Sequence, residues 1–139
     1  MPPSAPHVLV VEDSDLVSSA LRILLEETGR RVTIAGSVRA AGEAIAAAAA
    51  AGDEIALLLL DLTLADGDGL DVLDGARRRG TPPRVAVAMT GHDDDGTRAR
   101  CLAAGCVEVL VKPVPARVFL ARVGEWLADA SEERTAHGA

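Results

Sequence analysis

Five polar residues that could handle a phosphoryl group or a divalent cation follow directly after short apolar stretches of the sequence. Glu12 and Asp13 follow HVLVV, Asp61 follows IALLLL, Thr90 follows RVAVAM, and Lys112 follows VEVLV. Three neighbouring carboxylates repel one another, and a hard divalent cation such as Mg²⁺ relieves that repulsion. A carboxylate can also attack phosphorus, while an ammonium and a hydroxyl neutralise the transferred oxygens. These residue types together are suited to accepting a phosphoryl group.

Asp61 is the best candidate for the acceptor because it stands alone after an unbroken apolar run, residues 55–60, which predicts a central strand. The adjacent carboxylates of Glu12 and Asp13 are better suited to a metal ion. Taken singly, each residue has a plainer explanation, since an Asp or Thr after a strand can form a turn or cap a helix and a lysine can lie in a solvated loop. Their shared position after four separate strands favours chemistry.

The elements that must position these residues alternate between strand and helix along the chain. This alternation predicts an α/β fold, a doubly wound five-stranded parallel sheet with helices on both faces. Ligand sites in such sheets lie beyond the carboxyl ends of the strands, so we expect the polar residues to converge on one crevice. The apolar runs that predict the strands are residues 7–11, 31–35, 55–60, 84–89 and 107–111.

Composition limits the kinds of function. With 139 residues, 49% of them hydrophobic, the chain is expected to form one domain at 7–128, between a disordered lead-in at 1–6 and a polar C-terminal tail at 129–139. A formal charge of -7 without a Lys/Arg-rich block argues against generic nucleic-acid or anionic-membrane binding. Two cysteines are too few for a disulfide framework, and the sequence begins without a signal peptide, so we expect a cytoplasmic protein with reduced thiols.

The chain resembles the receiver domain of bacterial two-component response regulators. The matching stretches are VLVVEDSD at 8–15, LLLLDLTLADGDGLDVL at 57–73, AMTG at 88–91 and VKPV at 111–114. The resemblance runs from about Val8 to Leu127 and implies the flavodoxin-like strand order 2-1-3-4-5. Because the chain ends soon after the last helix, we expect a stand-alone receiver, which must act through another protein or pass its phosphoryl group onward.

The resemblance implies a role for each residue that matches a family motif. Asp61 would be the phosphoacceptor, and Thr90 would bond a phosphoryl oxygen and move on phosphorylation. Lys112 would pair with the phosphoryl group, next to a cis bond to Pro113. The phosphoryl donor would be a phosphohistidine on a sensor histidine kinase or on a phosphotransfer protein.

The resemblance also implies a metal site and a surface for a downstream protein. Mg²⁺ would be bound by Asp13, Asp61 and the backbone carbonyl of Thr63, and by Glu12 mainly through water. The downstream target would bind the helix at 97–104, the fifth strand and the last helix. We expect the chain to accept a phosphoryl group and to lose it in time, without turning over an external substrate as an enzyme does.

Val109 departs most from the family pattern, because receivers usually carry an aromatic residue at this position whose rotation accompanies activation. This departure leaves open a degenerate receiver that binds partners without phosphorylation. A second alternative is a Mg²⁺-dependent phosphohydrolase with an aspartyl-phosphate intermediate. Enzymes of the haloacid-dehalogenase type carry a second Asp as general acid two residues after the nucleophile, where this chain has Thr63.

Overall fold

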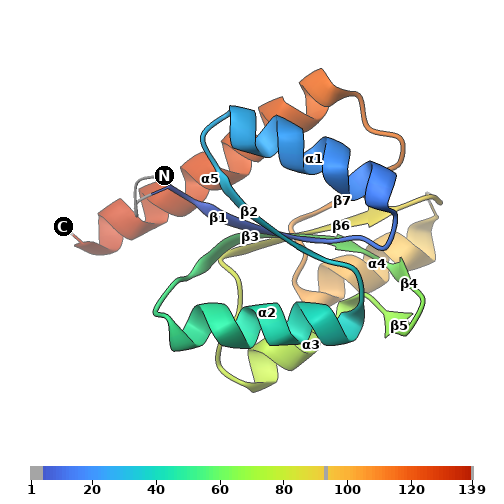
Figure 1. The fold of residues 1–139 in the computed structure, drawn as a ribbon, viewed down its shortest axis with the longest axis horizontal. Helices are drawn as coiled ribbons and strands as arrows, with labels where there is room; N and C mark the ends of the chain where they lie inside the picture. The colour runs from blue at the N-terminus through green and yellow to red at the C-terminus, as the bar shows by residue number, and fades with distance from the viewer. Residues whose placement is uncertain (1–4, 93, 139) are drawn as a thin grey trace.

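The computed structural model describes residues 5–92 and 94–138, with side chains described up to residue 128. Strands and helices alternate along the chain, as the sequence predicts, and a short hairpin follows the third strand (Figure 1). The elements are β1 (His7–Val11), α1 (Asp15–Glu27), β2 (Arg31–Ala35), α2 (Val38–Ala50), β3 (Ile55–Asp61), β4 (Thr63–Leu64), β5 (Gly67–Asp68), α3 (Leu70–Arg78), β6 (Val85–Thr90), α4 (Asp95–Ala104), β7 (Glu108–Val111) and α5 (Ala116–Gly138).

The central sheet is parallel and has the strand order β2-β1-β3-β6-β7. Without the two hairpin strands this is the order 2-1-3-4-5, so the predicted fold class and strand order are confirmed. β3 lies in the middle of the sheet, and every residue from Ile55 to Asp61 is buried. Burial on both faces explains why this strand is apolar throughout and does not alternate with polar residues.

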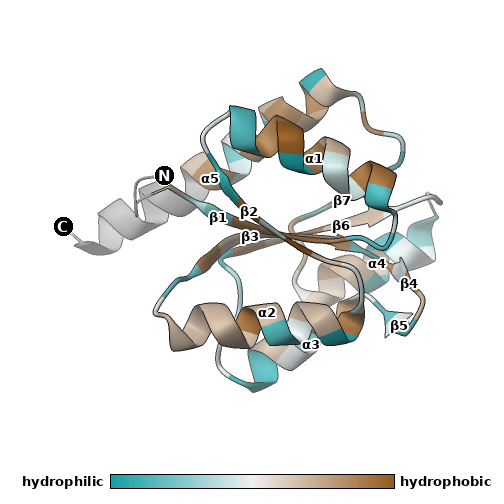
Figure 2. Ribbon diagram, in the orientation of Figure 1, coloured by the Kyte–Doolittle hydropathy of each residue, from teal (hydrophilic) through white to brown (hydrophobic). Residues whose placement is uncertain are grey.

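Helices cover both faces of the sheet, with α1 and α5 on one face and α2, α3 and α4 on the other (Figure 1). β1 directs Val8 and Val10 into the α1–α5 core and Leu9 and Val11 into the opposite core. Figure 2 shows hydrophobic residues along the sheet, between the two helix layers. The sheet is therefore fixed from both sides, and its carboxyl edge can hold polar side chains in defined positions.

Side-chain caps mark the starts of α1, α2 and α4. The Ser14 side chain caps α1 by accepting from the Val17 N–H, and the Ser37 side chain caps α2 by accepting from the Ala40 N–H. α4 begins at Asp95, two residues before the predicted start at Thr97. The earlier start follows from the Asp94 carboxylate, which accepts hydrogen bonds from the Thr97 N–H at 2.7 Å and the Thr97 hydroxyl at 2.9 Å.

Both ends of the chain fall partly outside the described residues. Of the predicted lead-in, residues 1–4 lie outside, whereas Ala5 is buried and its carbonyl accepts a hydrogen bond from the Arg31 guanidinium at 3.0 Å. α5 continues to Gly138, while the side chains of the predicted tail at 129–139 lie outside the description. Among the described residues, the helices lack the combination of length and apolar character that a membrane span requires.

A polar cluster around His7 lies at the amino end of β1, at the edge of the sheet opposite the predicted site. His7 Nε2 lies 2.7 Å from Thr33 Oγ1, and His7 Nδ1 lies 3.1 Å from Asp53 Oδ2. Arg31 binds both oxygens of Asp53, at 2.8 and 2.9 Å. Burial lowers the pKa of His7, and the nearby charge of Arg31 adds to this effect, so that together they outweigh the attraction of Asp53.

The lowered pKa of His7 predicts a pH-dependent stability. The unfolded chain takes up a proton near pH ~6.5, while the folded protein resists protonation there, so the unfolded state binds more protons in this window. The free energy of unfolding should therefore fall as the pH is lowered from about 7.5 to about 5.5. Urea denaturation across this range would measure it. His7→Gln should flatten the dependence, and an unchanged slope in that variant would contradict the assignment to His7.

Candidate functional site

The carboxyl ends of β1 and β3 bring three carboxylates together. One oxygen each from Glu12, Asp13 and Asp61 lies within 4.8 Å of the others. Glu12 and Asp61 are 3% and 6% exposed, whereas Asp13 is exposed. The parallel pairing of the two strands aligns Val11 with Leu60, so the residues that follow each strand emerge side by side. The sequence prediction that these three residues converge agrees with this geometry.

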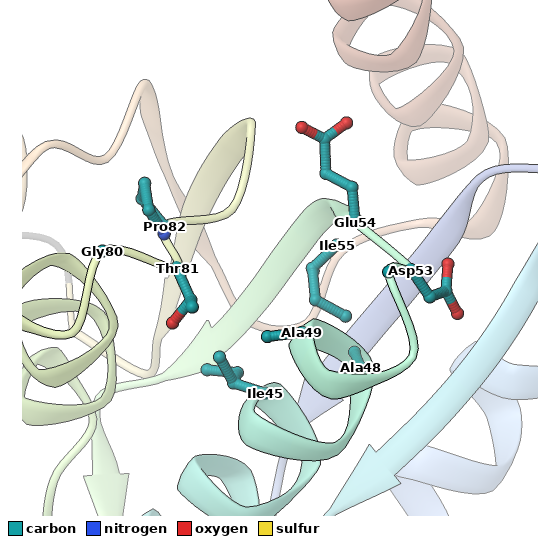
Figure 3. Close-up of a pocket in the computed structure, with 10 residues that line it drawn as sticks. Ile45, Ala48, Ala49, Asp53, Glu54, Ile55, Gly80, Thr81 and Pro82 are labelled. Atoms are coloured by element: carbon teal, nitrogen blue, oxygen red, sulfur yellow. The ribbon is translucent and has the colours of Figure 1, made fainter.

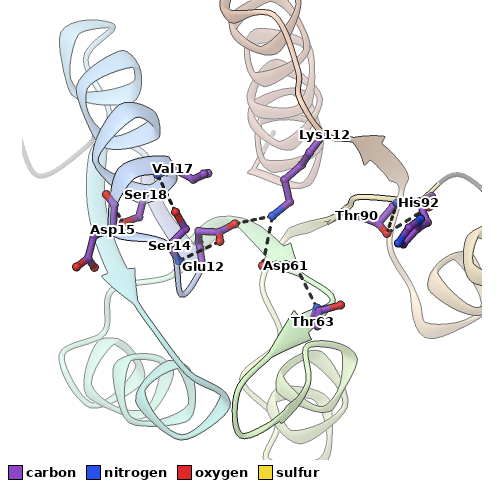
Figure 4. A network of polar contacts seen from close by, with 10 residues as sticks. All are labelled: Glu12, Ser14, Asp15, Val17, Ser18, Asp61, Thr63, Thr90, His92 and Lys112. Atoms are coloured by element: carbon purple, nitrogen blue, oxygen red, sulfur yellow. Dashed lines mark hydrogen bonds and ion pairs between the residues drawn. The ribbon is translucent and has the colours of Figure 1, made fainter.

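Lys112 supplies the cation of the site, and it follows β7 with a cis peptide bond to Pro113. Its Nζ lies 2.9 Å from Glu12 Oε2 and 3.3 Å from Asp61 Oδ2 (Figure 4). Partial burial tends to lower the pKa of Lys112, but the hydrogen bond to Glu12 and the charges of Asp61 and Glu12 outweigh it and raise the pKa. The ammonium is therefore charged at neutral pH and offsets part of the carboxylate charge.

Backbone amides orient the two buried carboxylates. The Ser14 N–H donates to Glu12 Oε1 at 3.1 Å, and the Thr63 N–H donates to Asp61 Oδ1 at 3.2 Å. Thr63 itself is exposed. Glu12 is thus held between a backbone amide and Lys112, and Asp61 is held in the same way, which fixes the direction in which each carboxylate faces.

Thr90 lies at the end of β6 and is 8% exposed, but its hydroxyl is engaged with its own loop. It donates to the His92 carbonyl at 3.2 Å and accepts from the His92 N–H at 3.1 Å (Figure 4). A hydroxyl has one hydrogen to donate, so bonding a phosphoryl oxygen would require it to release the His92 carbonyl. That Thr90 bonds a phosphoryl oxygen and moves on phosphorylation stays a prediction.

A hairpin after Asp61 adds a feature to the site that the strand pattern of the sequence does not predict. β4 and β5 pair antiparallel, with Thr63 opposite Asp68. The Asp68 carboxylate forms an ion pair with Arg100 of α4 and also accepts from the Leu70 N–H at 2.9 Å. The loop that carries the Thr63 amide is therefore bound to α4 as well as to the start of α3.

Gly69 packs against the backbone of Asp61 itself. Its N–H donates to the Leu62 carbonyl at 3.0 Å. A Cβ atom at this position would lie 2.0 Å from the carbonyl oxygen of Asp61, far inside van der Waals contact. Only a residue without a side chain fits this close approach, so Gly69 belongs to the structural frame of the acceptor.

The donor set fits the predicted Mg²⁺ ion. Three carboxylates face one ammonium in a partly buried site, which leaves excess negative charge for a cation to neutralise. Carboxylate oxygens are the hard ligands that Mg²⁺ prefers, and the ion commonly keeps several waters, which the exposed position of Asp13 allows. That the carbonyl of Thr63 is a further ligand stays a prediction.

A hollow of about 330 Å³ lies at the opposite edge of the sheet, between the end of α2, the start of β3 and the loop before β6 (Figure 3). Asp53 and Glu54 are among the residues that line it. Both are engaged with arginines, Asp53 with Arg31 at 2.8 Å and Glu54 with Arg84 at 2.7 Å. Ion pairing of this kind suits a structural role, so the candidate site is the carboxyl edge around Asp61.

Comparison with known proteins identifies relatives for most of the chain. The family model of the response regulator receiver domain matches residues 8–124. The transcriptional regulatory protein KdpE of Mycobacterium tuberculosis is 35% identical over 120 residues, covering 84% of this chain and 48% of that protein. AruR of Pseudomonas aeruginosa, also a transcriptional regulatory protein, is 29% identical over 153 residues, covering 93% of this chain and 62% of that protein. The chain thus spans about half the length of these relatives.

Solved structures have the same fold. A CheY-like response regulator receiver domain protein from Methanospirillum hungatei superposes with a TM-score of 0.78 at 27% identity, covering 94% of this chain and 99% of that one. The BeF3-activated N-terminal receiver domain of Klebsiella pneumoniae RstA gives a TM-score of 0.73 at 26% identity, covering 87% and 97%. A family match of this extent, on a sheet of the same fold, means that the chain belongs to the response regulator receiver domains, the signalling modules of two-component systems.

Proposed function

We propose that this chain is a cytoplasmic phosphoacceptor module that takes a phosphoryl group from a phosphohistidine onto Asp61 with Mg²⁺. The group then either switches a partner-binding surface or passes to another protein. The observation that carries this proposal is the position of Asp61 at the end of the central strand. Its carboxylate lies 3.3 Å from Lys112 Nζ and is grouped with Glu12 and Asp13.

In the proposed step, an oxygen of the Asp61 carboxylate attacks the phosphorus. The phosphorus–oxygen bond forms as the phosphorus–nitrogen bond of the donor breaks, and the imidazole leaves with the electron pair and is protonated. The Thr63 N–H orients the carboxylate. Lys112 lies close enough to stabilise the negative charge that develops on the phosphoryl oxygens. A bound Mg²⁺ would neutralise phosphoryl oxygens, as it does in other phosphoryl transfers.

The surface formed by α4, β7 and α5 is the proposed readout. It exposes three large apolar side chains, Leu102, Val107 and Val118, at 50%, 56% and 48%. An ion pair between Glu108 and Arg122 joins β7 to α5 on this surface. A phosphoryl group adds about -1.5 to -2 charge at neutral pH in common phosphoresidues, which is enough to bias a loop between two arrangements.

We propose that the phosphodonor protein approaches Asp61 from the side of α1 and α5. An apolar groove of about 410 Å³ opens there beside Lys112, and its walls include Leu16, Leu21 and Phe119. Leu16 is 82% exposed. A donor that docks on this groove would bring its phosphohistidine beside Lys112, and an apolar helical surface around the phosphohistidine would suit the groove.

Intact mass spectrometry tests the proposed chemistry directly. After incubation with Mg²⁺ and acetyl phosphate, the wild-type chain should gain a single phosphoryl adduct, because Asp61 can attack the small donor without a kinase. The adduct should be absent when Mg²⁺ is chelated and absent in Asp61→Asn, whose amide oxygen is a poor nucleophile. Asp71→Asn, an exposed carboxylate on α3, serves as the matched control and should be phosphorylated like the wild type.

Two other outcomes would replace the proposal. A folded chain that binds Mg²⁺ but takes no phosphoryl group from acetyl phosphate or from a phosphohistidine donor would favour a receiver that acts without phosphorylation. Repeated hydrolysis of an external phosphoester, lost in Asp61→Asn, would favour the phosphohydrolase. Thr63 at the position of a general acid argues against that second reaction.

A further inference from the structure

The backbone that faces the phosphoacceptor belongs to a hairpin that is too small to hold itself in place. β4 and β5 contribute two residues each, and an isolated hairpin even of larger size is only marginally stable in water. Within the described stretch from Thr63 to Asp68, Leu64 is the buried residue, and the others are exposed or half-buried. Something outside the hairpin must therefore fix its position relative to Asp61.

The turn of the hairpin is bound to the start of α2 by Asp66. The Val38 N–H donates to Asp66 Oδ1 at 2.8 Å, and the Arg39 N–H donates to Asp66 Oδ2 at 3.1 Å. The helix's own cap, Ser37, accepts from the Ala40 N–H at 3.0 Å, so the two earlier amides are left for Asp66. Hydrogen bonds from Val38 and then Arg39 lower the pKa of Asp66, which favours its charged form against the helix N-terminus.

A short chain of contacts connects Asp66 to the acceptor. Asp66 lies in the turn between β4 and β5, and the ladder of the hairpin pairs Thr63 with Asp68. The Thr63 N–H in turn donates to Asp61 Oδ1 at 3.2 Å. We propose that Asp66 is a positioning residue for phosphotransfer, which binds the β4–β5 hairpin to α2 and thereby holds the Thr63 amide against Asp61.

This inference rests on the proposed function. It predicts that loss of Asp66 slows phosphorylation of Asp61, which a helix-capping role alone would not do. If Asp66 served only to cap α2, its loss would lower the free energy of unfolding and leave the reaction at Asp61 unchanged. If it positions the hairpin, its loss lets the Thr63 amide move, and the Asp61 carboxylate is then oriented only by its contact with Lys112. Small displacements of an orienting group slow a reaction strongly.

The test compares Asp66→Ala and Asp66→Asn with Asp74→Ala, an exposed carboxylate on α3 that pairs with Arg78 at 3.4 Å. The phosphorylation rate is measured by intact mass at saturating Mg²⁺ and acetyl phosphate. We expect Asp66→Ala to react about tenfold more slowly than the wild type. Asp66→Asn should recover part of the rate, because its one amide oxygen can keep one of the two hydrogen bonds that the carboxylate accepts from Val38 and Arg39. Asp74→Ala should match the wild type.

The backbone amide resonance of Thr63 in a ¹H–¹⁵N spectrum provides a second measurement that needs no phosphoryl transfer. It should shift in Asp66→Ala and stay in place in Asp74→Ala. An Asp66→Ala rate equal to that of the Asp74→Ala control would overturn the inference, even if its stability fell. If the wild type itself takes no phosphoryl group, the proposed function fails, and the Thr63 resonance alone tests whether Asp66 positions the hairpin. An unchanged resonance in Asp66→Ala would then overturn the inference as well. A shift seen in Asp66→Ala and not in Asp74→Ala would support it.

Discussion

Gly69→Ala is expected to impair both the stability of the fold and the reaction at Asp61. The new Cβ would lie 2.0 Å from the Asp61 carbonyl oxygen and 3.2 Å from the Leu62 Cα, so the backbone of the phosphoacceptor or of the hairpin has to shift. Overpacking against rigid groups costs about 1–3 kcal/mol, and we expect the upper end here because backbone atoms collide. Phosphorylation by acetyl phosphate should slow by a factor of about ten or more, since Asp61 itself is displaced.

Urea denaturation and intact mass spectrometry would measure the two effects of Gly69→Ala separately. Gly124→Ala is the matched control. The residue lies in α5, and among the described residues no atom outside its chain neighbours and its own helix backbone lies within 4 Å of the added Cβ. That substitution should stabilise the protein by about 1 kcal/mol through helix propensity and leave phosphorylation unchanged. A Gly69→Ala variant as stable and as reactive as the wild type would show that the close approach is not required.

Leu58→Ala is expected to have the largest effect on stability alone. Leu58 is fully buried in β3, with Leu9 and Ala86 as its neighbours on the adjacent strands. Truncating a buried leucine costs about 3–5 kcal/mol when the surroundings cannot close on the cavity. The ladder hydrogen bonds on both sides of β3 prevent such a collapse, because the strand cannot shift without breaking them.

Trp126 provides the signal for this measurement, since it is the single tryptophan of the sequence and is 5% exposed in the α1–α5 core. Its emission should change when the protein unfolds in urea. Leu16→Ala, at a leucine that is 82% exposed, should change the free energy of unfolding by less than about 0.5 kcal/mol. Equal destabilisation by the two substitutions would mean that β3 is not the rigid centre of the fold.

The sheet could be predicted from the sequence because its strands are buried, and buried strands consist of apolar residues that are visible in the sequence. The run from Ile55 to Leu60 has no polar residue, and such a run fits a strand covered on both faces. The hairpin after Asp61 could not be predicted in this way. Its strands are two residues long, and Asp66 and Asp68 bind groups on α2 and α4 that are far away in sequence.

The convergence of the candidate site residues could be predicted from the sequence, but which of their side chains contact one another could not. The positions after the strands identify Glu12, Asp61 and Lys112 together, because parallel strands end at one edge. Nothing in the residue types shows that Lys112 lies closer to Glu12 than to Asp61, or that the hydroxyl of Thr90 is engaged with His92. Those details depend on side-chain torsions and loop paths, which short-range patterns do not specify.

The sparse burial of α4 has a consequence for how the native protein opens. Of the residues of α4, all of which are described, Cys101 is the buried one, whereas α3 buries five. Helices with few buried contacts open locally at a lower free energy than the surrounding structure. Because the Cys101 thiol is covered in the closed state, its reaction with a thiol reagent is gated by that opening. The rate of labelling therefore measures how often α4 leaves the sheet in an otherwise native molecule.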